Sequence, residues 1–367
     1  GQTIVLHPEG SPYQLTRTLW VNGVDDVTFR GSTGDPDDVV IAGPGMANPS
    51  YGDVPHLVHL NQSDGVTIAD LTLRDAWYHL IQLHRSDDVL LHNLRLVDAG
   101  EQHIKGSTES DRDGADRGVL QYSTMEFTTV GRWWYINGID IHAGADWIIR
   151  FNLFRNIRSD DGNLAGPALH MWNESSGTEV ESNVFLNCER GIALGLVDRT
   201  GYNDHEGGVI RNNFFYRSSV QSGDVGIHVA DSPGTRIINN TVILSDTYFA
   251  AIEYRYPAST DTYVANNLTD AIIWDRDGAT GTVEVNVTDA TPALFADISG
   301  GDPRLAATAA TVIDQGLELA DCASDFEGDV RPQGSAPDIG ADEYQTSHVF
   351  TDGFESGNTL AWLPERS

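Results

Sequence analysis

Lys105 is the only lysine in this chain of 367 residues, and it lies among residue types that acid–base chemistry needs. Its segment alternates apolar and polar residues, as do two later segments. In HIKGS, GIDIHAG and ALHMWNE the middle positions are Lys105, Asp140 and His170, and His142 lies two residues after Asp140. Such alternation is typical of β-strands, whose successive side chains point to opposite faces. A cation, a carboxylate and histidines on one face could bind an anion and move a proton.

Similar segments recur along most of the chain, and their middle positions form a predicted outward column. In chain order this column reads His59, Gln82, Lys105, Asp140, His170, Ala193, His228, Glu253 and Ile273. Two residues further on, the same face carries Asn61, His84, Ser107, His142, Trp172, Gly195, Ala230, Arg255 and Asp275. Solubility alone does not require so many histidines and charges on one face, so the column is a candidate site.

The column supplies a set of candidate residues. The predicted catalytic residues are Lys105, Asp140, His142 and His170. The predicted substrate-binding residues from the column are Gln82, His84, Trp172, His228, Glu253 and Arg255, and a resemblance given below adds Arg190. Lys105 and Asp140 would equally suit a surface ion pair, and Trp172 would suit either a sugar platform or packing under a loop. The Asp160–Asp161 pair suits a turn or calcium ligands, so the sequence allows calcium but does not require it, and it identifies no metal-ligand set.

A repeated asparagine indicates which elements position this column. An Asn followed by apolar residues recurs at spacings of 27 to 31 residues in the second half of the chain. A repeat of this kind predicts stacked coils of a solenoid, each unable to bury its apolar side alone. We expect Asn93, Asn152, Asn183, Asn213, Asn240 and Asn267 to stack on one inner turn, with Ser123 filling the gap between the first two.

These coils and the asparagine ladder resemble right-handed parallel β-helix proteins of the pectate lyase-like superfamily. The resemblance implies an all-β, single-stranded solenoid with short caps, over residues 1–345. The stretch DFEGDVRPQGSAPDIGADEY (325–344) is similar to the closing segment of secreted bacterial β-helix proteins. Residues 346–367 resemble the C-terminal extension of exported proteins. The resemblance therefore implies a secreted or cell-surface bacterial protein, with the active site on the outer face of the first strand of each coil.

Two predicted loops would border that face. Residues 107–117 and 197–207 interrupt the coils at the same strand end, so we expect them to wall a cleft over the coils that contain Lys105 to Ala193. An oligosaccharide would then lie over Trp172 between these loops.

Composition narrows the partners. The formal net charge of −32 leaves no basic stripe for nucleic acid, so we expect no nucleic-acid partner. No run of 18 apolar residues could span a membrane, and nothing in the sequence calls for a partner chain, so we expect a monomer.

The resemblance and the column together favour a lyase or a C5-epimerase that acts on an acidic polysaccharide. Proton removal beside a uronate carboxylate needs a cation, a base and, for elimination, an acid. Asp140 stabilises the ammonium form of Lys105, so we assign Lys105 to charge neutralisation and His142 or His170 to the base. Arg255 would grip a second carboxylate. The stretch EVESNVFLNCERGIALGL also resembles β-helices of polysaccharide lyase family 6, which draws attention to Arg190.

Two other functions remain open on the sequence. A glycoside hydrolase needs two carboxyl groups, and Glu253 with Asp275 on adjacent coils would be the pair. A sugar-binding or structural surface protein would need no catalytic group.

Overall fold

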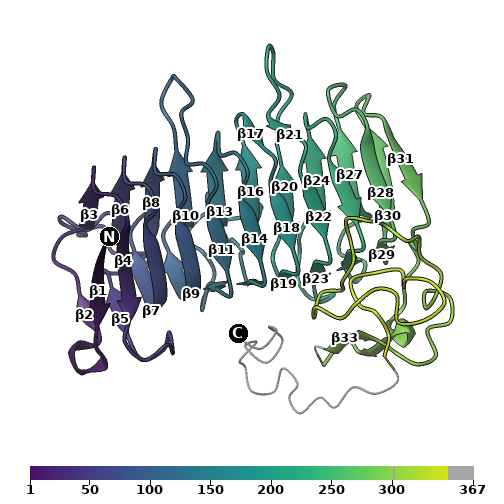
Figure 1. Cartoon of the computed structure of the whole chain (residues 1–367), viewed down its shortest axis with the longest axis horizontal. Coiled ribbons are helices and arrows are strands. Elements are labelled where there is room, and N and C mark those ends of the chain that lie inside the picture. Colours follow the sequence, from purple (N-terminus) through teal and green to yellow (C-terminus); the bar gives the residue numbers. More distant parts are fainter. Residues whose placement is uncertain (301, 346–367) are drawn as a thin grey trace.

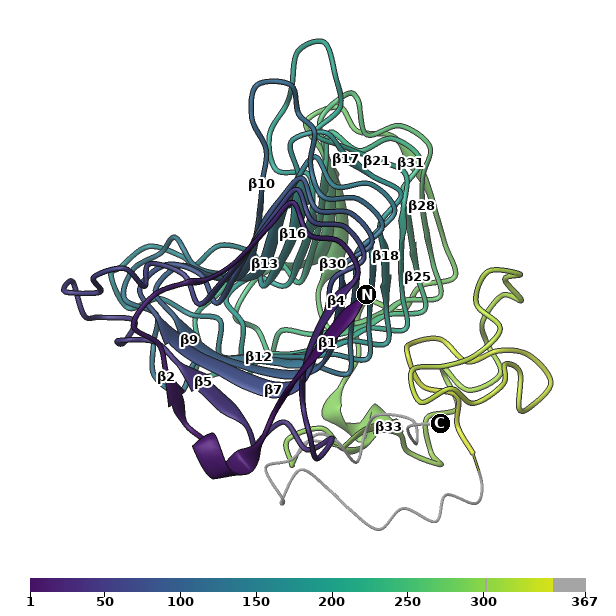
Figure 2. The same ribbon diagram turned by 60° about the vertical axis from the view of Figure 1, so that its left-hand side comes forward.

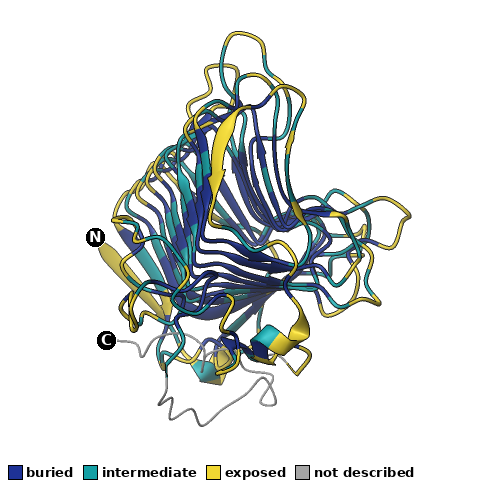
Figure 3. Ribbon diagram, turned by 90° about the vertical axis from the view of Figure 1, so that its right-hand side faces the viewer, coloured by how far each residue is buried: buried dark blue, intermediate teal, exposed yellow. Residues whose placement is uncertain are grey.

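The computed structural model describes residues 1–300 and 302–345, so the predicted extension at 346–367 lies outside the described residues. The chain forms a right-handed parallel β-helix, as predicted, with the coils stacked along the long axis in Figure 1. Apart from two short 3₁₀ turns, η1 (Pro8–Gly10) and η2 (Pro292–Leu294), its regular elements are strands. Figure 3 shows strands that are mostly buried, with exposed residues in the turns and loops and in the end strands β1 (Gln2–Leu6) and β31 (Gly281–Glu284).

The first strand of each coil belongs to one ten-stranded parallel sheet. Its apolar side chains, such as Leu60, Leu83 and Ile104, point into the helix and are fully buried. In spatial order the strands are β3 (Leu19–Asn22), β6 (Val58–Asn61), β8 (Ile81–His84), β10 (Gln102–Ser107), β13 (Asn137–His142), β16 (Leu169–Trp172), β20 (Ile192–Leu194), β24 (Ile227–Ala230), β27 (Ala250–Arg255) and β30 (Ile272–Arg276).

The remaining sides of the coils form a nineteen-stranded sheet. One row holds β1 (Gln2–Leu6), β4 (Val27–Gly31), β11 (Val119–Gln121), β14 (Ile148–Arg150), β18 (Glu179–Glu181), β22 (Val209–Arg211), β25 (Arg236–Ile238), β28 (Thr262–Ala265) and β31 (Gly281–Glu284). The other row holds β2 (Tyr13–Gln14), β5 (Val40–Ala42), β12 (Thr124–Glu126), β15 (Leu153–Arg155), β19 (Val184–Leu186), β23 (Phe214–Tyr216), β26 (Thr241–Ile243) and β29 (Leu268–Thr269). The long strands β7 (Thr67–Ala76) and β9 (Leu90–Ala99) belong to both rows.

The asparagine ladder lies at the turn between these two rows. Each Nδ2–H donates to the Oδ1 of the next asparagine at 2.9–3.0 Å, along the series Asn152, Asn183, Asn213, Asn240, Asn267 and Asn286. Ser123 fills the preceding place, because its N–H donates to Asn152 Oδ1 at 2.9 Å. The ladder thus satisfies buried polar groups along the stack, as predicted.

The prediction was wrong for Asn93. Asn93 has a φ of 52° and pairs with Asp70, while Leu94 takes the ladder position and donates its N–H to Ser123 Oγ at 3.0 Å. A left-handed residue precedes every ladder position, and Asn93 is that residue in its own coil. Asparagine tolerates this conformation better than most residues, so the sequence pattern alone does not separate the two positions.

The last described part of the chain, which ends at residue 345, folds back along the side of the coils. The asparagines that precede ladder positions donate to its backbone: Asn212 to Ser324 at 2.7 Å and Asn266 to Leu317 at 2.8 Å. Where two asparagines follow each other in the sequence, the first therefore binds the closing segment and the second forms the ladder. Figure 2 places this segment across the helix from the outer face of the ten-stranded sheet. In this part of the chain β32 (Phe295–Asp297) and β33 (Asp302–Leu305) pair antiparallel.

Elsewhere, β17 (Ser175–Ser176) and β21 (His205–Glu206) on neighbouring coils form a separate parallel pair.

Two sequence expectations concern single features. Cys188 is a buried free thiol, as predicted, and Cys322 is also buried and free. Among the described residues, no helix is long and apolar enough to cross a membrane.

Candidate functional site

The predicted outward column exists along most of the ten-stranded sheet. Its members face one another on successive strands, in the order Trp20, His59, Gln82, Lys105, Asp140, His170, Ala193, His228 and Glu253. In the last coil the predicted outward positions are wrong by one residue. In the β27–β30 register Glu253 lies beside Trp274, and Arg255 lies beside Arg276. A register irregularity between Ala250 and Ile252 moves Ile273 and Asp275 out of the two predicted outward positions.

The structure brings the predicted catalytic residues and Trp172 together in one group, here named the lysine cluster: Lys105, Asp140, His142, His170 and Trp172. Hydrogen bonds join all of them except His170, whose Nδ1 lies 3.8 Å from Asp140 Oδ1. Lys105 Nζ donates to Asp140 Oδ2 at 2.7 Å and to His142 Nε2 at 2.9 Å. Trp172 Nε1–H donates to Asp140 Oδ1 at 2.8 Å. The side chains of Lys105 and Asp140 are 7% and 2% exposed. Lys105 and Asp140 thus form a buried ion pair, not an exposed pair at the surface.

The electrostatics of the lysine cluster keep its histidines neutral. Burial, reinforced by the Lys105 ammonium, lowers the pKa of His142 to about 4. Burial likewise lowers the pKa of His170 to about 4, against the opposing attraction of Asp140. For Asp140 burial favours the neutral form, but the Lys105 ammonium, with smaller contributions from the neighbouring imidazoles, outweighs it and holds the pKa of Asp140 below the usual value. His170 Nε2 is buried without a hydrogen-bond partner.

Trp172 is half-buried rather than exposed, which differs from the sugar-platform expectation. Its ring stacks on His170 with centroids 4.6 Å apart, and the Arg199 guanidinium lies 5.5 Å from its centroid. Arg199 belongs to the predicted loop 197–207, so that loop partly covers Trp172.

The two predicted loops, 107–117 and 197–207, meet each other. Arg112 stacks over the Tyr202 ring at 3.7 Å and pairs with Glu174 at 2.7 Å. In Figure 1 these loops rise highest above the coils, after β10 and after β20. They therefore enclose one end of the lysine cluster.

Gln82 and His84 lie on the N-terminal side of this cluster. Gln82 donates to Ser107 Oγ at 3.0 Å, and His84 Nδ1 contacts Asn61 Oδ1 at 2.6 Å. Both side chains are therefore engaged along the column. The Asp160–Asp161 pair forms a turn, in which Asp161 accepts N–H groups from Asn163 and Trp134 at 2.9 Å.

The other predicted binding residues gather further along the same face, around a cavity of about 150 Å³. We name this group the arginine pocket: Arg190, Asp224, His228, Tyr248, Glu253, Arg255 and Arg276, with apolar residues between them. Each guanidinium has an acidic neighbour, with Arg190–Asp224 at 3.3 Å, Arg276–Glu253 at 3.3 Å and Arg255–Asp277 at 2.6 Å. The Nε atoms of Arg255 and Arg276 are buried without a hydrogen-bond partner.

Three titratable side chains in the arginine pocket have shifted pKa values. Burial, with the nearby Arg255 charge, lowers the pKa of His228 to about 3, and its Nε2 has no hydrogen-bond partner. Burial raises the pKa of Glu253, and Arg276 offsets only part of that shift. Burial, together with Asp224 and Glu253, also raises the pKa of Tyr248, whose O–H donates to Glu253 Oε1 at 3.2 Å. The pocket thus combines a neutral imidazole, a protonated phenol and guanidinium groups.

Sequence reasoning missed Asp224, Tyr248 and Arg276. Asp224 and Tyr248 lie in the turns just before β24 and β27, where no alternation assigns a direction to a side chain. Arg276 was missed through the one-residue shift in the last coil. The predicted hydrolase pair is also corrected, because Asp275 pairs with Tyr254 and so points to the face opposite Glu253.

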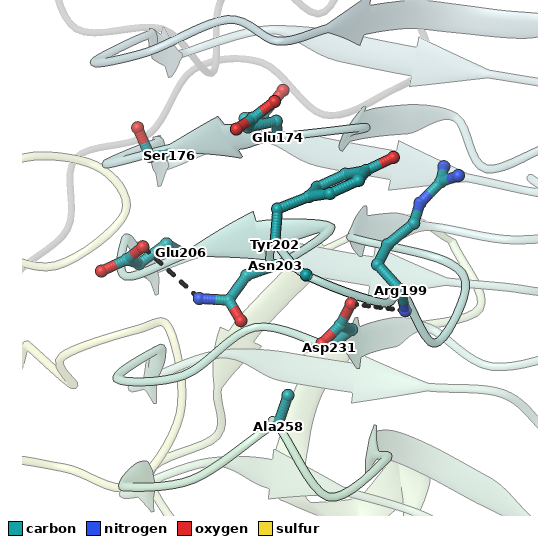
Figure 4. A pocket seen from close by; sticks show the side chains of 10 residues that line it. Glu174, Ser176, Arg199, Tyr202, Asn203, Glu206, Asp231 and Ala258 are labelled. Atoms are coloured by element: carbon teal, nitrogen blue, oxygen red, sulfur yellow. Dashed lines mark hydrogen bonds between the residues drawn. The ribbon is translucent and has the colours of Figure 1, made fainter.

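A larger hollow of about 560 Å³ lies beside loop 197–207. Figure 4 shows its labelled residues, including Glu174, Arg199, Tyr202 and Glu206, with the Arg199 N–H bonded to Asp231. They come from loops, turns and the short strands β17 and β21 rather than from the outer face of the ten-stranded sheet. The smaller arginine pocket holds the more complete set of acid–base groups.

Comparisons place the fold among known β-helices. The sequence matches no protein-family model and shows no significant similarity to curated proteins. Similar solved structures include PfbA, a surface adhesin of Streptococcus pneumoniae, with 16% identity, a TM-score of 0.56, and coverage of 74% of this chain and 70% of that one. Pectate lyase Pel9A has 13% identity, a TM-score of 0.52, and coverage of 92% and 98%. A GH136 lacto-N-biosidase from Eubacterium ramulus has 11% identity, a TM-score of 0.52, and coverage of 79% and 63%. These identities establish the shared fold alone.

Proposed function

We propose that this chain is a bacterial enzyme, secreted or held at the cell surface, that acts as a monomer on an acidic polysaccharide. It removes the proton next to a uronate carboxylate, as a lyase or a C5-epimerase, within a unit spanning residues 1–345. The similar structures include a pectate lyase, a glycoside hydrolase and an adhesin, and this range of printed functions is compatible with a carbohydrate ligand.

The observation that carries the proposal is the composition of the arginine pocket. Proton abstraction beside a carboxylate needs positive charge to stabilise the enolate-like transition state, and Arg190, Arg255 and Arg276 line the same cavity. It also needs a base, and elimination needs an acid for the leaving oxygen. His228 and Tyr248 supply one candidate for each role in that cavity.

His228 is the candidate base because its Nε2 has no hydrogen-bond partner and its ring is neutral at pH 7. Its pKa of about 3 makes it a weak base before substrate binds, and the negative charge of a bound uronate carboxylate would raise that pKa towards the working pH. Tyr248 suits the acid because its raised pKa keeps the phenol protonated. In the lysine cluster, by contrast, the His142 Nε2 lone pair already accepts from Lys105. The lysine cluster would therefore hold Trp172 and His170 in place on the same face, two strands before His228, with His170 the alternative base.

The test is an ultraviolet assay for unsaturated products against a panel of uronate polymers, with calcium and with a chelator. The wild-type chain should release such products from at least one polymer, and His228→Asn should lower turnover at least about 100-fold. His7→Asn, at an exposed histidine remote from the pocket, is the matched control and should keep full turnover. Solvent deuterium incorporation without chain cleavage would identify the epimerase. Binding without either reaction would refute the enzyme and leave a sugar-binding protein.

A second candidate is hydrolysis, and one observation favours it. Asp224 and Glu253 both line the arginine pocket and both interact with Tyr248. A raised Glu253 pKa suits a general acid, with Asp224 as the second carboxylate. New reducing ends without unsaturated products, lost in Glu253→Gln, would establish hydrolysis in place of elimination.

A further inference from the structure

The closing segment contains three acidic residues whose carboxylates face one another. Asp325, Glu327 and Asp342 each offer an oxygen, and these oxygens all lie within 4.8 Å of one another. Asp325 and Asp342 are 1% and 3% exposed, and Glu327 is half-buried. The group lies across the helix from the arginine pocket, in the segment that Figure 2 shows beside the coils. It is therefore independent of the proposed reaction.

One of these carboxylates has an unpaired, buried oxygen. Asp342 Oδ2 accepts the Leu305 N–H at 2.7 Å, whereas Asp342 Oδ1 is buried without a hydrogen-bond partner. A buried carboxylate oxygen without a partner loses its hydration and gains nothing in return. Close approach of two more carboxylates adds like-charge repulsion. A bound cation would remove both penalties.

The backbone around Asp325 holds its carboxylate in place. Asp325 Oδ1 accepts the N–H groups of Glu327 and Asp329 at 2.9 and 2.8 Å, and its Oδ2 accepts the Glu343 N–H at 3.1 Å. These contacts fix a tight turn that presents Asp325 and Glu327 together. The Phe326 N–H bonds to the Ala341 carbonyl at 3.0 Å and so brings the turn against Asp342. The carboxylates are thus preorganised before any ligand binds.

Of the two nearby guanidinium groups, Arg331 is engaged with other acceptors, whereas Arg304 binds both carboxylate oxygens of Glu327 at 3.1–3.3 Å. Arg331 pairs with Glu343 at 2.8 Å, with both side chains 1% exposed, and donates to the carbonyls of Gly340 and Ala341. Arg304 reaches Glu327 at 3.1 Å, from the side of Asp302. Arg304 therefore contacts the half-buried acid, while Asp325 and Asp342 are the two most buried members of the group.

We propose that Asp325, Glu327 and Asp342 bind a calcium ion that fastens the closing segment to itself and, through Asp342, to β33. All three donors are carboxylate oxygens, which suit a hard cation, and none is a histidine or cysteine that would favour zinc. Oxygens bound to calcium at about 2.3–2.6 Å lie at most about 5 Å apart, which fits the observed spacing. Water and backbone carbonyls would complete the coordination. The ion joins the Asp325 turn to Asp342, whose neighbour Leu305 belongs to β33.

The experiment measures the thermal midpoint of the whole chain in chelator and in calcium. Calcium at about 100-fold above its Kd should raise Tm by about 5 °C, and metal analysis after gel filtration should find one equivalent. Asp342→Asn keeps the shape and the Leu305 contact but should abolish the shift. Glu327→Gln, at the half-buried acid, is the second variant in case Asp342→Asn does not fold. Glu318→Gln removes an exposed charge from the same segment and should keep the full shift.

Two results would overturn the calcium site. One is a wild-type Tm that calcium leaves unchanged, since a proton shared between Asp325 and Asp342 would then relieve the repulsion. The other is a calcium shift that persists in both Asp342→Asn and Glu327→Gln, since the ion would then bind elsewhere. Neither outcome depends on whether the arginine pocket proves catalytic, because the readouts are stability and bound metal.

Discussion

The lysine cluster and the arginine pocket lie on the same face of the same sheet, yet they use their charges differently. In the lysine cluster, Lys105 and both oxygens of Asp140 are paired within the cluster. In the arginine pocket each guanidinium is also paired with a carboxylate, but these pairs border a cavity, and the Nε of Arg255 and the Nε2 of His228 have no hydrogen-bond partner. A closed group of charges fixes positions, whereas an open group can receive a ligand. On the function proposed above, the first region would position side chains and the second would bind substrate.

The largest expected effect is on stability, from breaking the lysine cluster. Lys105→Met leaves Asp140 buried without its cation, which should lower the free energy of unfolding by about 3–5 kcal/mol. Chemical denaturation measures this loss. The double variant Lys105→Met/Asp140→Leu should recover most of it, because an apolar pair leaves no uncompensated charge. A Lys105→Met chain of normal stability but no turnover would reverse the comparison and make Lys105 the catalytic cation.

The next effect is on turnover, from removing one charge of the arginine pocket. Arg255→Met should lower kcat/KM about 100-fold, because charge stabilisation in the transition state is lost. Its stability should change by less than about 1 kcal/mol, since the pair with Asp277 is partly exposed. Arg74→Met, which breaks a comparable exposed pair with Asp75, should leave both quantities unchanged. Equal turnover in the two variants would remove the pocket from the reaction.

The third expected effect is a pH dependence of stability, through His170 of the lysine cluster, that kcat/KM does not share near pH 6.5. His170 has a pKa of about 4 in the folded chain against about 6.5 when unfolded, so the unfolded state takes up the proton first as pH falls. Stability should therefore drop from pH 6.5 towards pH 4, by about 2 kcal/mol at pH 5 from His170 alone. Denaturation at pH 7 and pH 5 should show a smaller drop in His170→Asn. kcat/KM should show no acid limb near pH 6.5, because His228 stays neutral down to about pH 3.

The fold could be predicted because its signals repeat. The ladder asparagines recur with coil length, and one misplaced member, Asn93, does not disturb the pattern, since its neighbour Leu94 fills the position through its backbone. The column could be predicted for the same reason, because alternation fixes which side chains leave the core. It fails only where a register irregularity at Ala250 breaks the alternation.

The burial and the hydrogen-bond partners of the site residues could not be predicted, because alternation shows which way a side chain points but not what surrounds it. Lys105 points outward as expected, but contacts with Asp140 and His142 from the next strand cover it. Asp224 and Tyr248 reach the arginine pocket from turns, through contacts between coils that no local pattern encodes. Neighbours about 30 residues away in sequence decide which outward side chains are fully paired and which border a cavity.

The smallest expected effect concerns Trp172, at the border between the two regions. Trp172→Phe keeps an aromatic ring to stack on His170 but removes the N–H that binds Asp140. A hydrogen bond to a charged group contributes about 1.5–3 kcal/mol, and Asp140 retains Lys105, so a loss of about 1–2 kcal/mol in unfolding free energy is expected. Oligosaccharide affinity, measured by calorimetry, should stay unchanged if the substrate lies in the arginine pocket. Tenfold weaker binding at unchanged stability would instead mean that the ring is a sugar platform. In that case the lysine cluster would be part of the binding surface, and the division between a positioning region and a binding region would fail.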